Sequence, residues 1–356
     1  MAERITGYLG PPPPPPRGPL SAHLLEHLLE PPHEVPPAPP PEDDPLCGDD
    51  SQLALYCCYE LHYRSLAGVD EAWEWEPSLL ALRRRLESGF ERRLREELGP
   101  APVPEPGGME RALRQVIDAG DGPSLSLYMQ ERGTLQEMRE FAVHRSAYQL
   151  KEADPHTWGI PRLGDGPKAA FIEIQLGEYG GGVEAAMHSK LFATTMATLG
   201  LDPAYGAYLH LLPGTTLATT NLISMLGLHR RLRGALVGHL ALFEATSVVP
   251  MARYRDAMSR LGLGAEAQEF YEVHVDADAH HEVVALRALA GGLARAEPTL
   301  AADILFGARA AMLVEDRFAR HLLDAWAEGR TSLLAPLPEE GGPVLAPGGE
   351  ALSRSG

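Results

Sequence analysis

The sequence predicts an all-α protein whose main part is a bundle of seven helices. Of its 356 residues, 44% are hydrophobic but only 6% are aromatic. Alanine and leucine, which favour helices, are abundant, whereas runs of β-branched residues are rare. No segment alternates apolar and polar residues for long enough to indicate a strand. Prolines and glycines separate the segments of helical periodicity, as is typical of short connections.

The N-terminal 108 residues predict two regions outside the bundle. Residues 1–49 are dominated by proline. Since proline has no backbone donor and a fixed φ, we expect a disordered arm with at most a short helix at 20–29. Residues 50–108 predict a helical extension that ends in a proline- and glycine-rich linker. Its second helix begins at 76–78, where proline suits the first turn.

Residues 109–330 predict the main domain, and residues 331–356 a flexible tail rich in proline and glycine. Breakers such as Asp154-Pro155 and Glu297-Pro298 divide the domain into helical segments. These segments are expected near 109–119, 124–152, 168–198, 203–228, 230–260, 264–293 and 297–328.

Charge and composition exclude several classes of function. The formal net charge is −18 and the pI is near 5.2, which argues against a nucleic-acid partner because phosphate binding needs clustered cations. Three cysteines predict no disulfide framework and fit a reducing compartment. No stretch approaches about 18 uninterrupted apolar residues, so we expect no membrane partner and a cytoplasmic location.

The segment 271–281 carries the densest group of potential metal ligands. His274, Asp278 and His281 occupy positions i, i+4 and i+7 of a predicted helix. At about 100° per residue they fall within roughly 60° of one another, on one face. Nitrogen and oxygen donors without a thiolate suit non-haem iron better than structural zinc. The alternative is a solvated acidic helix with incidental histidines.

Glu178 and His188 flank three consecutive glycines at 180–182. Ten residues of regular helix rotate by about 280°, which would place the two side chains on different faces. Because three glycines are costly inside a helix, we expect a local unwinding that can bring both onto one metal. Alternatively, Glu178 caps the following helix and His188 is a core histidine.

Two further glutamates complete the set of candidates. Glu244 lies in an apolar segment, where a carboxylate needs a cationic partner. That partner is either a metal or one of Arg253 and Arg255. Glu152 ends its helix just before the Asp-Pro break and, taken alone, is an ordinary helix-end acid.

The candidates comprise four carboxylates and three imidazoles, an inventory that suits two irons rather than one. They are Glu152, Glu178, His188, Glu244, His274, Asp278 and His281. Their order, Glu, Glu-x9-His, Glu and His-x3-Asp-x2-His, resembles the haem-oxygenase-like di-iron oxidases, often labelled iron-containing redox enzymes. The resemblance covers about 109–330, and its intervals are similar to those of N-oxygenating members.

The resemblance implies two Fe(II) ions that activate O2 through a peroxo-diferric intermediate, with an external electron donor such as a reductase. Glu178 and His188 would serve one iron together with His281. Glu244, His274 and Asp278 would serve mainly the second, and Glu152 would be the extra carboxylate of N-oxygenating members. The implied reaction is N-oxygenation of an amine or amino-acid-derived substrate in specialised metabolism.

Other functions stay open on the sequence. The same site can perform oxidative C–C cleavage or desaturation of an amino or fatty acid, or plain hydroxylation. A non-catalytic helical scaffold with the proline arm as its interaction element is the alternative of another class. A haem oxygenase is disfavoured, since it has no use for four buried acids. Relatives are commonly dimers, so the resemblance leaves a homodimer as one possible state, while the sequence itself does not determine the oligomeric state. Four aromatic residues are candidate pocket residues: Tyr148, Trp158, Tyr179 and Tyr271.

Overall fold

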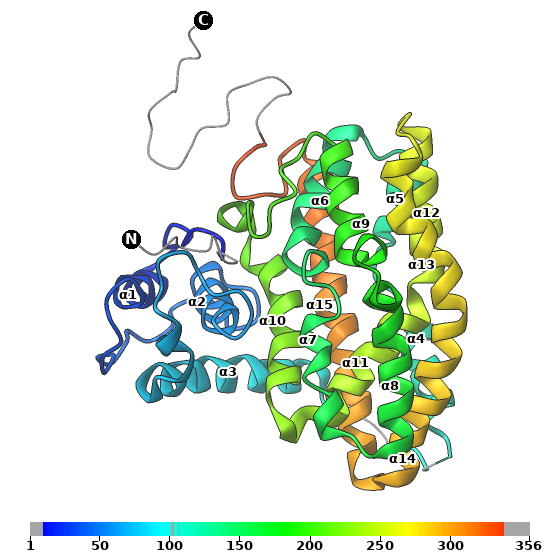
Figure 1. Ribbon diagram of the computed structural model, residues 1–356, viewed down its shortest axis with the longest axis horizontal. Helices are drawn as coiled ribbons and strands as arrows, with labels where there is room; N and C mark the ends of the chain where they lie inside the picture. Colours follow the sequence, from blue (N-terminus) through cyan, green and yellow to red (C-terminus); the bar gives the residue numbers. More distant parts are fainter. Residues whose placement is uncertain (1–9, 101–102, 106, 338–356) are drawn as a thin grey trace, which may run out of the picture.

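The computed structural model describes residues 10–100, 103–105 and 107–337, without the side chains of residues 276, 278 and 279. Within these ranges the secondary structure is helical, with no strand. Figure 1 shows an upright bundle with a smaller helical layer packed on one side of it. The predicted all-α class is therefore confirmed.

The small layer contains α1 (Pro19–Leu28), α2 (Asp49–Glu60) and α3 (Pro77–Leu98). The bundle contains α4 (Met109–Asp118), α5 (Leu125–Glu131), α6 (Leu135–Gln149), α7 (Asp154–Thr157), α8 (Asp165–Glu178), α9 (His188–Thr198), α10 (Gly214–Leu228), α11 (Arg233–Thr246), α12 (Val248–Arg260), α13 (Ala265–Val283), α14 (Gly291–Ala296) and α15 (Ala301–Ala327). Helix α15 packs along α10 and α11, α13 lies against α9 and α12, and α2 joins the small layer to α10.

Several predicted helices are divided in two. A capping box at Thr134, completed by Glu137, separates α5 from α6. Ala153 has φ 72°, outside the helical region, so the chain turns between α6 and α7. Helices α11 and α12 meet at Ser247. Residues 284–290 continue α13 as a π-helix before α14.

The prediction of a disordered proline-rich arm is wrong for residues 10–49. Leu20, Leu24 and Leu28 are buried on the inner face of α1, which packs against α2. The carboxylate of Asp50 accepts hydrogen bonds from the backbone nitrogens of Leu20 and Ser21 at 2.9 and 2.7 Å. This acid satisfies orphan donors at the start of α1 and ties the arm to α2. Residues 1–9 lie outside the described residues.

The prediction of a flexible tail is likewise wrong for residues 331–337, the first seven of the predicted tail. Leu333 and Leu337 are buried. The Ser332 hydroxyl donates a hydrogen bond to Glu140 in α6 at 2.7 Å, and the Ser332 backbone nitrogen donates to the same carboxylate at 2.9 Å. The rest of the predicted tail, 338–356, lies outside the described residues.

Among the described helices, none is both long and apolar enough to cross a membrane by itself. Only the pair formed by α11 and α12 reaches the required length and composition, and its two members are bent by 50° relative to each other.

Candidate metal centre

The connection between α8 and α9 brings the first two candidates together. Helix α8 ends at Glu178 and α9 begins at His188. Between them the three glycines all have positive φ, at 63°, 63° and 84°, a conformation that side chains with a Cβ rarely adopt. The break predicted at these glycines is therefore present. It places Nδ1 of His188 2.8 Å from Oε2 of Glu178.

Four side chains form the first donor group: Glu152, Glu178, His188 and His274. One ligand atom from each lies within 4.8 Å of the others, and all four residues are buried. His274 Nε2 is 3.7 Å from Oε1 of Glu152. The rings of His188 and His274 have centroids 4.1 Å apart. Helices α8, α9 and α13 and the turn after α6 thus contribute to one cluster.

The second donor group consists of Glu178, Glu244 and His281, again buried and with ligand atoms within 4.8 Å of one another. His281 Nδ1 lies 3.4 Å from Oε2 of Glu244 and 4.0 Å from Oε1 of Glu178. Glu178 belongs to both groups. Its Oε2 contacts His188 of the first group, whereas its Oε1 faces His281 of the second.

Six of the seven predicted ligands thus lie in two adjoining groups, while the side chain of Asp278 is outside the described residues. The grouping differs from the one that the resemblance implied. His188 lies with His274 and Glu152, and His281 lies with Glu244. The competing cations for Glu244 have other partners. Arg253 donates to Ser124 and Ser126, and Arg255 pairs with Asp256.

A backbone hydrogen bond fixes the orientation of His274. Its Nδ1 lies 2.6 Å from the carbonyl oxygen of Phe270, one turn earlier in α13. A carbonyl can only accept, so Nδ1 carries a proton, and Nε2 is the ring nitrogen that faces Glu152. Metal-ligating histidines are commonly held by such a bond to the second ring nitrogen.

His281 fits in its position because the residue opposite it in α8, Gly177, has no side chain. A Cβ added to Gly177 in α8 would lie 2.7 Å from Cε1 and 2.9 Å from Nε2 of His281. A side chain at this position would force the imidazole to shift from its place against α8, where its Nδ1 faces the glutamates. Sequence reasoning missed Gly177, because a glycine before three others carried no separate signal.

The turn that carries Glu152 is anchored by the small layer. The neighbouring Lys151 is fully buried, and its Nζ lies 2.8 Å from Oε2 of Glu60 in α2. The Tyr205 hydroxyl donates to the other oxygen of Glu60 at 2.7 Å. The ammonium also lies 4.4 Å from the ring centroid of Tyr63. Sequence reasoning did not link the N-terminal extension to the candidate ligands, because nothing in the sequence indicated that Lys151 is buried or that Glu60 is its partner.

Electrostatics distinguish the glutamates. Burial raises the pKa of Glu152 above its usual value, although the contact with His274 opposes the shift. Burial also acts against ionisation of Glu178. The contact with His188, together with the nearby His274 and His281, outweighs it and holds the Glu178 pKa below its usual value.

The donor chemistry fits divalent iron. Oε2 of Glu152 is buried and has no hydrogen-bond partner in the described part of the chain. Buried polar atoms are normally satisfied, so such an orphan indicates a missing partner. Three buried carboxylates surrounded by imidazoles require cationic charge, and mixed nitrogen and oxygen donors are those that iron accepts.

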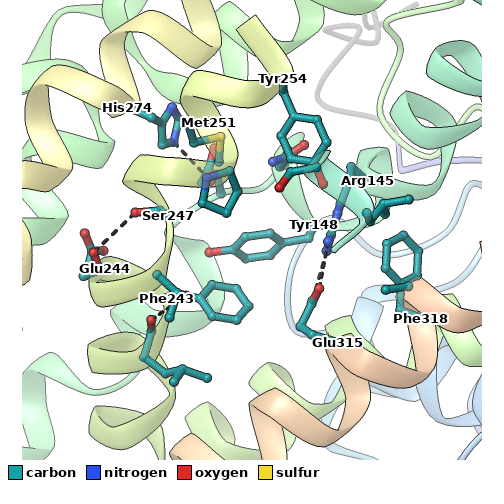
Figure 2. A pocket seen from close by; sticks show the side chains of 18 of the residues that line it. Arg145, Tyr148, Phe243, Glu244, Ser247, Met251, Tyr254, His274, Glu315 and Phe318 are labelled. Atoms are coloured by element: carbon teal, nitrogen blue, oxygen red, sulfur yellow. Dashed lines mark hydrogen bonds and ion pairs between the residues drawn. The ribbon is translucent and has the colours of Figure 1, made fainter. Parts of the chain in front are cut away.

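A cavity of about 320 Å³ opens beside these groups and is lined by Glu152, Glu178, Glu244 and His274. Figure 2 shows Tyr148 in its middle, with the hydroxyl on the side of Glu244 and with Arg145 and Glu315 on the opposite side. Most of the remaining wall is apolar or aromatic: Phe141, Leu240, Phe243, Met251, Tyr254, Tyr271 and Phe318.

Two of the four predicted pocket aromatics, Tyr148 and Tyr271, line this cavity. Trp158 and Tyr179 are not among its lining residues. The Tyr179 hydroxyl instead donates a hydrogen bond of 2.8 Å to Asp154, just after the turn that carries Glu152.

Comparisons with known proteins place this arrangement in a family. A family model described as iron-containing redox enzyme matches residues 139–316, half of the chain. A solved structure of a CADD-like protein of unknown function from Nostoc punctiforme has a TM-score of 0.50 and 15% identity. The match covers 62% of this chain and 97% of that one.

A second structure of the same Nostoc protein matches with a TM-score of 0.49 and 15% identity, over 63% of this chain and 96% of that one. At this identity the likeness bears on the fold alone. No protein with a curated description matches the chain. The matched range includes every predicted ligand from Glu152 to His281, and the chain belongs to the iron-containing redox enzyme family.

Proposed function

We propose that the chain is a non-haem di-iron oxygenase that uses O2 as co-substrate. The observation that carries the proposal is the position of Glu178, which has one carboxylate oxygen near each of two buried donor groups. A single metal would need only one of these groups. Two groups that share a carboxylate match the bridged metal pairs found in helical bundles.

When bound, two ferrous ions would supply O2 activation. Glu152, His188 and His274 would hold one iron, Glu244 and His281 the other, and Glu178 would offer one carboxylate oxygen to each group. The resemblance adds Asp278 as a further ligand. The chain itself orients His274 through the Phe270 carbonyl and lines the adjoining cavity with aromatic side chains, among them Tyr148 and Phe243.

Two charged side chains on the cavity wall are the support for an amine or amino-acid-like substrate. Arg145 and Glu315 form a two-point ion pair at 3.0 and 2.7 Å on this wall. Their side chains are nevertheless 20% and 25% exposed, and both line the cavity. A positive and a negative group presented together suit a zwitterion, whose carboxylate and ammonium can pair with Arg145 and Glu315.

N-oxygenation is the reaction that we propose for this site. Its support is Glu152, which adds a fourth donor to the first group and corresponds to the extra carboxylate of the N-oxygenating relatives that the chain resembles. Oxygenation by O2 needs electrons from outside the chain, and a reductase is the partner that we propose as their source. The three free cysteines fit a reducing compartment such as the cytoplasm.

The test combines metal counting with product analysis. The purified chain is loaded anaerobically with Fe(II), its iron is counted, and it is exposed to O2 with a panel of amines, amino acids and fatty acids. We expect two irons per chain and amine products heavier by oxygen. No bound iron would support the scaffold, and cleaved or desaturated products would support the alternative chemistry.

Glu152→Ala separates N-oxygenation from the other outcomes. We expect the product rate to fall about 100-fold or more, the scale of losing a metal ligand or its support. Glu173→Ala, on the solvent side of α8 with a 52% exposed side chain, is the matched control and should behave like the parent. An unchanged rate in Glu152→Ala would show that Glu152 is not a metal ligand that the reaction needs.

A further inference from the structure

A second cluster of potential metal ligands lies in the small layer, outside the buried centre. His27 is in the last turn of α1, Glu30 lies in the bend after it, and His33 directly follows that bend. One ligand atom from each lies within 4.8 Å of the others. His27 Nδ1 is 2.8 Å from His33 Nε2, and Glu30 Oε2 is 4.0 Å from the same nitrogen.

A backbone carbonyl fixes the protonation of His33. Its Nδ1 lies 2.8 Å from the carbonyl oxygen of Pro31. Because a carbonyl only accepts, Nδ1 carries the proton, and Nε2 of the neutral ring presents a lone pair towards His27 and Glu30. This is the hydrogen bond that typically orients a metal-bound histidine.

A buried tryptophan holds the segment in place. Trp73 is 0% exposed, and its Nε1 donates a hydrogen bond of 3.0 Å to the Glu30 carbonyl oxygen. The His33 ring packs edge-on against Trp73 at 5.2 Å, and the His27 ring packs against His23 at 4.6 Å. The two imidazole rings and the backbone of Glu30 are therefore positioned by contacts that need no metal, which reduces the entropic cost of binding one.

We propose that His27, Glu30 and His33 form a second metal site that takes one divalent zinc-type cation. Two imidazole nitrogens and one carboxylate oxygen are three of the four ligands of a tetrahedral zinc site, with the fourth position left to water. Without metal, His27 Nδ1 donates its proton to the hydrogen bond with His33 Nε2. On metal binding this proton moves to Nε2 of the His27 ring, so that His27 Nδ1 and His33 Nε2 both bind the metal. The metal joins the end of α1 to the segment that follows it.

The site formed by His27, Glu30 and His33 differs from the buried centre in its exposure to solvent. The side chains of His33 and Glu30 are 33% and 61% exposed, so a cation can exchange with solvent without opening the bundle. The cavity beside the buried centre is not lined by any of the three residues. The role that follows is structural, fastening the N-terminal arm, and it does not depend on the proposed oxygenase function.

The first experiment counts zinc. The metal-free full-length chain is equilibrated with Zn²⁺ by dialysis and compared with the double variant His27→Gln/His33→Gln. We expect the parent to hold one more zinc per chain than the double variant. His210→Gln removes an exposed imidazole that is not part of this cluster, and should hold as much zinc as the parent. Equal zinc in parent and double variant would overturn the proposal.

The second experiment reads the site directly. Zinc should change the fluorescence of Trp73, which touches His33, and the change should be absent in Trp73→Phe. In Glu30→Gln, a change at an exposed side chain, the zinc needed for the half-maximal signal should rise at least about tenfold. An unaltered titration in Glu30→Gln would contradict the three-ligand site. Iron in the buried centre is measured separately, so failure of one site leaves the other testable.

Discussion

The two donor groups of the buried centre share Glu178 but are held by different means. In the first group, hydrogen bonds and an ion pair do the positioning. His274 is fixed by the Phe270 carbonyl, and Glu152 follows a lysine paired with Glu60. In the second group, His281 is positioned by steric fit against Gly177. Polar anchors fix orientation and protonation, whereas a steric fit fails when one methyl group is added.

Replacing the shared residue should have the largest effect on metal content. Glu178→Ala removes a ligand from both groups, so we expect bound iron to fall from two per chain towards zero. Iron is counted after anaerobic loading and removal of excess metal. Glu173→Ala, also in α8 but exposed, should keep both irons. If Glu178→Ala also kept both, the carboxylate would not be shared.

Gly177→Ala should affect the second group alone. The added Cβ would lie 2.7 Å from His281 Cε1, so the imidazole must shift from its position beside Glu178 and Glu244. We expect loss of one iron per chain, with the first group still loaded. The matched control is Gly166→Ala in the first turn of α8, where an added Cβ meets nothing within 4 Å. Equal loss from both groups would show that they do not respond independently.

The smallest effect on metal content is expected from the anchor in the small layer. Glu60→Gln leaves the buried Lys151 ammonium without its carboxylate, a change that typically costs about 3–5 kcal/mol of folding free energy. We expect denaturant midpoints to fall and iron at the first group to bind about tenfold more weakly, with two irons still bound at saturation.

The double variant Glu60→Gln/Lys151→Gln removes both charges and should recover part of the lost stability. If Glu60→Gln left the iron titration unchanged while stability fell, the ion pair would support the fold without positioning Glu152.

The sequence alone predicted what depends on local pattern. Helical periodicity indicated most of the bundle, the glycines at 180–182 indicated the break before His188, and ligand spacing indicated the candidate residues. Contacts between residues far apart in the sequence determine the features that were not predicted. The arm packs because Asp50 holds the first turn of α1, and the fit of Gly177 against His281 joins residues far apart in the chain.

The grouping of the ligands was also beyond local pattern. His274 and His281 share one face of α13, yet the structure places them in different donor groups. Which group each joins depends on where the ends of α8 and α9 lie, and that is set by the packing of helices rather than by spacing within one helix.

The central claim is that Glu178 joins two iron sites, and magnetic measurements on the air-oxidised protein test it most directly. A carboxylate-bridged pair predicts two irons per chain whose spins couple, so that Mössbauer spectra at low temperature show a diamagnetic ground state and electron paramagnetic resonance shows almost no ferric signal. Isolated ferric ions that account for all of the bound iron would contradict the shared carboxylate.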